Sequence, residues 1–261
     1  MQFHSPIWLE AGAVIQSMEI EIVRDAVDDS PLFINQVFDR LLTDIALCVL
    51  APGQRIRQSA LATDLQVSRQ PISHALQLLK HEGLLQDAGR QGLQVTPINA
   101  EYMRLLYQAR KPLESTAAAL AAQRIADGNV SDEERARFEL ALEEGTHKLK
   151  TKASVQDAAW ADYEFHVALY RLSGNQVIEQ MMNGRWAHIM RSIIVTDSYN
   201  TLESAWEEHA AIAQAVLGGA VLEAGDVAAR HVQRAGRDLY RRLEAANAAP
   251  APTPGNPAST R

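Results

Sequence analysis

Two runs of apolar residues at helical spacing, joined by a tight turn, mark residues 51–85. The apolar positions fall on one face of each predicted helix, at Leu61, Ala62 and Leu65 and then at Ile72, Ala75, Leu76 and Leu79. Gln66 and Val67 form the turn, and Ser68 is placed to cap the second helix with its side-chain oxygen. Pro71 falls in the first helical turn, where its missing N–H costs little. Periodicity alone fits a plain two-helix unit as well as a helix-turn-helix.

The polar face of the second helix and the segment after it narrow this choice. The outward positions are Arg69, Gln70, Ser73, His74 and Gln77. A polar face that begins with arginine suits a helix whose N-terminal end enters the major groove of DNA. Gly83 stops the helix, and short strand-like segments at 84–85 and 93–96 flank a turn that places Arg90 near its tip. A hairpin in this place predicts a wing, which favours a winged helix-turn-helix.

Beyond residue 100 the pattern is helical throughout. The expected helices cover residues 101–127, a segment opened by the capping box of Ser131 and Glu134, and residues 154–173, 175–195, 201–217 and 222–246. Gly184 weakens the middle of the 175–195 helix. Six helices of this length predict an antiparallel bundle. The fold class is therefore mainly α, with an N-terminal winged helix-turn-helix and a C-terminal antiparallel all-helical bundle.

These patterns divide the chain into four parts. They are an N-terminal extension at 1–29, a winged helix at 30–96, the bundle at 100–246 and a tail at 247–261. The extension matches no pattern, so disorder and an extra helix both remain open. The winged helix is expected to begin with a helix over 30–49, capped by Ser30 with Pro31 at its first position. The tail is rich in Pro, Ala, Ser and Thr and is expected to be disordered.

Composition and charge place these domains in a class of protein. A length of 261 residues allows two domains with sizeable cores. The single cysteine, Cys48, excludes an internal disulfide framework, lies in an apolar run as filler, and suits a reducing cytoplasm. We find neither a membrane-spanning apolar run nor a secretory signal, so we expect a cytoplasmic protein with no membrane partner. The net charge is −7, yet residues 51–100 carry five basic and three acidic side chains, as phosphate binding requires.

Candidate chemistry is concentrated on three of the bundle helices. Asp162 and His166 are four residues apart, so a helix brings them to nearly the same face about 6 Å apart along its axis. A carboxylate and an imidazole on one face can hold a metal ion, and His209 and His231 follow on the last two helices. Taken singly, each histidine is more often a core or capping residue than a ligand.

The winged-helix segment resembles a known family. The stretch from Pro52-Gly53 through Val67-Ser68-Arg69 and Pro71 to Glu82-Gly83-Leu84 is similar to the winged helix of the GntR family of bacterial transcription regulators. The resemblance implies a double-stranded DNA operator, with contacts expected from Arg57, Arg69, Gln70, Ser73, His74 and Arg90. Ser73 stands where the family usually carries a second DNA-contacting arginine, so the operator sequence does not carry over. Gln66 replaces the glycine of the turn, which is tolerable if it reaches a left-handed conformation at some cost.

The bundle resembles the FCD effector domain of the FadR subgroup of that family. The matching positions run in order through Arg110, Leu113-Glu114, Ala121-Ala122, Asp162, Phe165-His166, Gly174-Asn175, His209 and Asp226 to His231. The resemblance implies a divalent metal held by Asp162, His166, His209 and His231. Zinc is our first expectation, and nickel, manganese and iron suit the same ligands. His4, His74, His81, His147 and His188 match no ligand position.

A metal with three imidazoles and one carboxylate keeps open positions for a small organic acid. Arg110 is the first candidate to bind its carboxylate, although a helix-surface salt bridge with Glu114 is the alternative. Asn175 could also reach the effector, or it could cap the next helix. We therefore expect a homodimeric, ligand-responsive regulator and not an enzyme. A metal-dependent hydrolase of a small organic acid and a metal-free regulator that responds to an acyl thioester are the alternatives.

Overall fold

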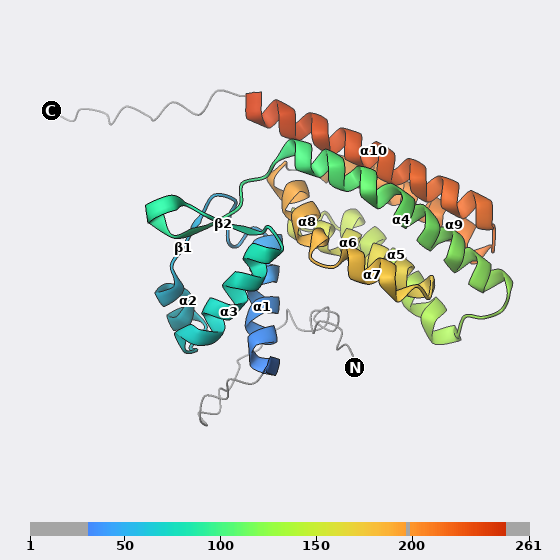
Figure 1. Ribbon diagram of the computed structural model, residues 1–261. Coiled ribbons are helices and arrows are strands. Elements are labelled where there is room, and N and C mark those ends of the chain that lie inside the picture. Colours follow the sequence, from blue (N-terminus) through green and yellow to red (C-terminus); the bar gives the residue numbers. More distant parts are fainter. Residues whose placement is uncertain (1–30, 197–198, 249–261) are drawn as a thin grey trace.

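The computed structural model describes residues 31–196 and 199–248, and it has two parts (Figure 1). A small N-terminal part combines helices with a three-stranded sheet, and a larger part is entirely helical. The expected fold class, mainly α with a winged helix-turn-helix ahead of a helical bundle, is confirmed. Residues 1–30 and 249–261 lie outside the described residues, as do the expected Ser30 cap and nearly all of the tail. Residues 247–248 continue the last helix.

The N-terminal part has the element order of a winged helix. Its elements are α1 (Pro31–Ala46), β1 (Arg55–Ile56), α2 (Gln58–Asp64), α3 (Arg69–His81), β2 (Leu85–Asp87) and β3 (Leu93–Val95). The strands pair antiparallel in the order β1-β3-β2, and a short 3-10 turn at Gly89–Gln91 forms the wing tip. Sequence patterns missed β1, a two-residue strand with no alternation of its own that forms by pairing with β3.

The turn between α2 and α3 follows the expected geometry with one difference. Gln66 has φ 54°, the left-handed conformation that its position requires. Ser68 stands at the N-cap of α3, but its side chain makes no capping hydrogen bond, so the predicted cap is wrong in this detail. The helix is held instead by its apolar face, because Ile72, Ala75, Leu76 and Leu79 are all fully buried.

The bundle contains seven described helices, not the expected six. They are α4 (Ala100–Ala126), α5 (Asp132–Lys150), α6 (Val155–Leu172), α7 (Gln176–Met182), α8 (Arg185–Val195), α9 (Tyr199–Leu217) and α10 (Val221–Ala248). The prediction of one helix over 175–195 is wrong, because the chain breaks at Asn183 and Gly184. Gly184 has φ +65°, and the next helix leaves in a new direction. This break brings the start of α8 against the winged helix, where Arg185 pairs with Glu82.

Small residues let the bundle helices pack closely. The helices α4 and α10 run antiparallel along one side of the bundle (Figure 1). At Gly236 an added Cβ would lie 2.7 Å from the Cβ of Tyr107, so only glycine fits between these helices. The expected capping box of Ser131 and Glu134 opens α5. Within residues 31–196 and 199–248, no helix combines the length and the apolar character that crossing a membrane would need.

Candidate functional site

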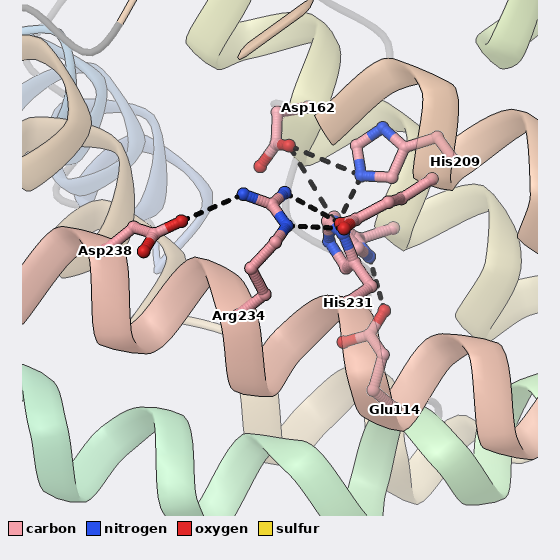
Figure 2. Close-up of polar contacts among 8 residues, drawn as sticks. Glu114, Asp162, His209, His231, Arg234 and Asp238 are labelled. Carbon is pink, nitrogen blue, oxygen red and sulfur yellow. Dashed lines mark hydrogen bonds and ion pairs between the residues drawn. The ribbon is translucent and has the colours of Figure 1, made fainter. Parts of the chain in front are cut away.

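Three helices bring the four candidate ligands together inside the bundle. Asp162 and His166 lie on α6, His209 lies on α9 and His231 on α10. The three histidines are buried, and Asp162 is 6% exposed. Figure 2 shows the side chains of Asp162, His209 and His231 turned toward one another. The i,i+4 spacing on α6 places the Asp162 carboxylate and the His166 ring on one face of the helix, with Oδ1 and Nε2 4.0 Å apart. The other two ligands come from helices that pack over this face.

The distances among these groups suit a shared metal ion. The Nε2 atoms of His209 and His231 lie 3.3 Å apart. Two imidazole nitrogens bound to one tetrahedral zinc at about 2.0–2.1 Å would be separated by roughly the same distance. The Oδ1 atom of Asp162 lies 3.6 Å from His209 Nε2 and 4.0 Å from His166 Nε2. One nitrogen from each of the three histidines falls within 4.8 Å of the others.

Carboxylates behind two of the three histidines orient the nitrogens that face the centre, whereas Nδ1 of His209 is buried with no hydrogen-bond partner among the described residues. Glu114 is hydrogen-bonded to Nδ1 of His166, and Oε2 of Glu208 lies 2.7 Å from Nδ1 of His231. A carboxylate accepts a hydrogen bond, so Nδ1 of each ring carries the proton and Nε2 keeps its lone pair. The Nε2 atom of His166 is buried with no hydrogen-bond partner among the described residues. These are the tautomers that metal ligation requires.

The electrostatic environment favours neutral rings and keeps the carboxylate of Glu114 charged, whereas burial raises the pKa of Asp162. Burial lowers the pKa of His166, His209 and His231, and for His209 the neighbouring His231 lowers it further. Burial alone would raise the pKa of Glu114, but His166, Arg110 and the Tyr170 hydroxyl hold it well below its usual range. Neutral imidazoles backed by ionised carboxylates are effective metal ligands.

Glu208 belongs to a chain of charged groups that sequence reasoning missed. Burial opposes ionisation of Glu208, but hydrogen bonds from His231 and Arg234 lower its pKa to about 2. The Nη2 atom of Arg234 donates to Glu208 Oε2 at 2.7 Å, and its Nη1 donates to Asp238 at 3.1 Å (Figure 2). Glu208 precedes His209 in the sequence yet serves His231 on another helix. The only sign of this role in the sequence was that the Glu208 carboxylate stands next to a candidate metal ligand, His209.

Arg110 combines the two roles that its sequence context left open. Its Nε donates to Glu114 Oε2 at 3.0 Å, so the i,i+4 pair forms, but it is buried and not on the helix surface. Its Nη2 atom is buried without a hydrogen-bond partner in the described part of the chain. The guanidinium carbon lies 4.4 Å from the centre of the Trp186 ring, which stacks on His166. Arg110 therefore keeps a free donor next to the candidate ligands.

A small cavity adjoins this cluster. Its volume is about 50 Å³, and it is lined in part by Arg110, Asp162, His231 and Arg234. This volume holds only one or two water-sized groups. Asn175, the other residue expected to bind an effector, does not line it. Its side chain accepts a hydrogen bond from the backbone N–H of Val177 and caps α7, which is the alternative role that the sequence allowed.

The residues expected to contact DNA lie along α3 and around it. Arg69 and Gln70 occupy the first turn of α3 and are exposed, as is His74, whereas Ser73 is half-buried. Exposed Arg57 immediately precedes α2, and exposed Arg90 lies in the wing turn. Within the described ranges these three arginines make no ion pair, so their charges face solvent.

Two family models match the chain in the same order as these two parts. Residues 33–95 match the model described as bacterial regulatory proteins, gntR family, and residues 105–234 match the FCD domain. The chain belongs to the GntR family. The family recognised from the sequence is thereby confirmed, and the buried ligand cluster lies within the FCD match of this GntR-family chain.

Several curated relatives share part of the GntR-family chain. The uncharacterized HTH-type transcriptional regulator YdhC of Bacillus subtilis is 29% identical over 147 residues, which are 56% of this chain and 63% of that protein. The Nta operon transcriptional regulator of Aminobacter aminovorans is 31% identical over 143 residues, 52% of this chain and 65% of that protein. HTH-type transcriptional regulator LutR of B. subtilis is 28% identical over 192 residues, 65% of this chain and 84% of that protein. The chain spans slightly less than two thirds of the first two relatives.

Solved structures share the fold over about four fifths of this chain. E. coli McbR/YncC superposes with a TM-score of 0.70 and 20% identity, covering 81% of this chain and 98% of that one. A putative transcriptional regulator GntR from Rhodococcus sp. RHA1 gives a TM-score of 0.69 at 22% identity, covering 79% and 96%. At these sequence identities the similarity concerns the fold alone, and it gives no information on ligands or on the DNA sequence that is bound.

Proposed function

We propose that this chain is a DNA-binding transcription regulator whose operator binding is controlled at a metal centre in the FCD domain. The observation that carries the control is the buried cluster of His166, His209 and His231, with Oδ1 of Asp162 within 4.0 Å of the Nε2 atoms of His166 and His209. The exposed first turn of α3 supports DNA binding, because Arg69 and Gln70 are free to reach base edges. Two copies would place two such helices on a pseudopalindromic operator.

The four ligands would hold a divalent ion, zinc being our first choice. When bound, the ion would supply open coordination positions that attract an anionic oxygen. Arg110 would bind the same anion through its unpartnered Nη2 atom, as guanidinium groups bind carboxylates. Another arginine in the cavity lining, Arg234, is already paired with Glu208 and Asp238. A small organic acid could bind both the metal ion and Arg110 through its carboxylate.

The size of the cavity limits the effector. A volume of about 50 Å³ suits a carboxylate with few other atoms, unless side chains such as Arg234 move aside. An acyl thioester with its nucleotide carrier would need far more room, which weighs against the metal-free alternative. The names of the relatives describe regulators, which supports regulation over a metal-dependent hydrolase.

Helix α8 provides a route from this centre to the winged helix. Its Trp186 ring contacts both His166, at 5.2 Å between ring centres, and Arg110. Two and five residues further along α8, His188 and Arg191 hydrogen-bond to backbone carbonyls of Glu82 and Thr96 at the base of the wing. An effector would act by binding one arrangement of α8 better than another.

The metal proposal is tested by replacing two ligands at once. The H209A/H231A double variant should purify without the equimolar metal that we expect in the parent, because two of four ligands are gone. Elemental analysis of the purified full chain measures this directly. H147A, which removes an exposed histidine on α5, is the control and should keep the metal. Equal metal content in the parent and the double variant would contradict the assignment of these residues as metal ligands.

The DNA proposal is tested at Arg69. Duplexes selected from random DNA by the parent protein serve as operator, and binding is followed by fluorescence anisotropy. R69A should weaken binding to the selected duplex by at least about fivefold, since an arginine–guanine contact contributes about 1–3 kcal/mol. R137A removes an exposed arginine on α5 and should bind as the parent does. Undiminished binding by R69A would refute its role.

A further inference from the structure

A second cavity lies between the winged helix and the bundle, away from the ligand cluster. Its volume is about 390 Å³, within the range of small-molecule sites. The winged helix contributes the end of α3 and the linker that follows β3, and the bundle contributes the start of α4 and the first two turns of α8. Pro97, Ile98, Tyr102 and Met103 give this interdomain cavity an apolar wall, and Thr96 and Arg191 give it polar groups.

Arg191 is the unusual member of this lining. Its residue exposure is 2%, and its guanidinium has two hydrogen-bonding contacts, both with neutral groups. Nη1 donates to the backbone oxygen of Thr96 at 2.6 Å, and Nη2 donates to Nδ1 of His188 at 3.2 Å. His188 in turn donates from Nε2 to the backbone oxygen of Glu82 at 3.0 Å, which fixes its tautomer. The Nε atom of Arg191 is buried with no partner among the described residues.

The charges around the interdomain cavity do not balance. Glu82 is the one carboxylate in its lining, and its Oε2 atom pairs with Arg185 at 3.4 Å. Burial, followed by the charge of Arg191, lowers the pKa of His188 to about 4, so this ring is neutral at pH 7. Burial also lowers the pKa of Arg191 to about 10, which leaves it charged. One buried positive charge therefore lacks a counter-charge in the described lining, and such a charge is costly unless paired.

We propose that the interdomain cavity binds a small organic anion, a carboxylate with an apolar body, on Arg191 and Thr96. The free Nε–H and a remaining Nη2–H of Arg191 lie on the same edge of the guanidinium and suit the two oxygens of a carboxylate. The Thr96 hydroxyl, which is also buried without a partner among the described residues, supplies a third donor. The apolar wall would cover the body of the ligand. This site uses none of the metal ligands and does not depend on the proposed control by metal.

The position of this site between the two domains determines what a bound anion would do to the molecule. An anion held between Thr96 in the linker and Arg191 on α8 would contact both domains at once. It would therefore favour the arrangement in which the winged helix is docked on the bundle.

Benzoate is a suitable probe, because it joins a carboxylate to an apolar ring and exceeds the 50 Å³ cavity at the metal centre. Calorimetric titration of the full chain, zinc-loaded and EDTA-treated, should give saturable 1:1 binding in both states. R191Q should weaken it by at least about tenfold, since hydrogen bonds to charged groups are the strong ones. R104Q removes a cation from the surface of α4, outside the cavity lining, and should bind within about twofold of the parent.

A second variant keeps the test decisive if R191Q fails to fold. T96V removes a buried hydroxyl without a described partner, so its fold should be no weaker, yet benzoate affinity should fall by about threefold or more. Inorganic phosphate is titrated in parallel. No saturation by benzoate, saturation by phosphate alone, or unchanged benzoate affinity in R191Q and T96V would each overturn the proposal.

Discussion

At the residue scale, the carboxylates behind the histidines decide what the ligand cluster can bind. Glu208 fixes the ring of His231 through Nδ1 and is itself held by Arg234. Without Glu208, the ring of His231 would lose the partner that selects its tautomer and orientation. The contribution of Glu208 to metal binding can therefore be measured separately, by changing Glu208 while all the ligands stay in place.

We expect E208Q to bind zinc about 10–100-fold more weakly than the parent, because the glutamine keeps the shape but loses the charge that strengthens His231 as a ligand. Competition with a fluorescent zinc chelator measures the affinity. E207Q changes the exposed neighbour on the same helix and should leave the affinity unchanged. Equal weakening by both variants would show a general charge effect in place of the Glu208–His231 contact.

The four candidate ligands were accessible to sequence reasoning because one pair has helical spacing and the family resemblance supplied the other two. Glu114 was visible only as a partner of Arg110, since its bond to His166 joins α4 to α6. Glu208 was not found, because it acts across the α9–α10 contact. Such contacts between helices have no signature in local spacing.

At the element scale, the break before α8 directs a helix at the winged helix. Gly184 adopts φ +65°, and an added Cβ would lie 2.6 Å from Oε2 of Glu82. The sequence indicated a weak point here, but a glycine in a helical pattern does not reveal whether the helix bends or ends. Most other boundaries in the bundle were predicted to within a few residues, since apolar periodicity and caps determine them locally.

Replacing Gly184 by alanine should therefore be more harmful than the left-handed backbone alone explains. G128A is the matched control, because Gly128 has φ +67° with nothing within 4 Å of an added Cβ. G128A should lower the free energy of unfolding by about 1–2 kcal/mol. G184A should lower it further, because Glu82 must also move away from Arg185. Urea denaturation followed by circular dichroism measures both, and equal losses would argue against the contact with Glu82.

At the scale of the whole molecule, the winged helix and the bundle are joined by more than their linker. The contacts of α8 at Glu82 and Thr96 hold the base of the wing, and α1 packs against α8 as well. The sequence indicated two domains and a short connection between them. It did not indicate how they dock, because the partners of His188 and Arg191 are backbone carbonyls, which any sequence provides.

The connection between the domains is held at both ends. Arg191 binds the carbonyl of Thr96, and the side chain of Asn99 accepts from the backbone N–H of Tyr102 and caps α4. Only two residues separate these anchors, so the winged helix stays docked on the bundle as long as both contacts hold. In the proposed dimer, the separation of the two recognition helices would then be fixed where the bundles meet. The base-pair spacing between operator half-sites would then be a property of the effector domain and not of the winged helix that reads the bases.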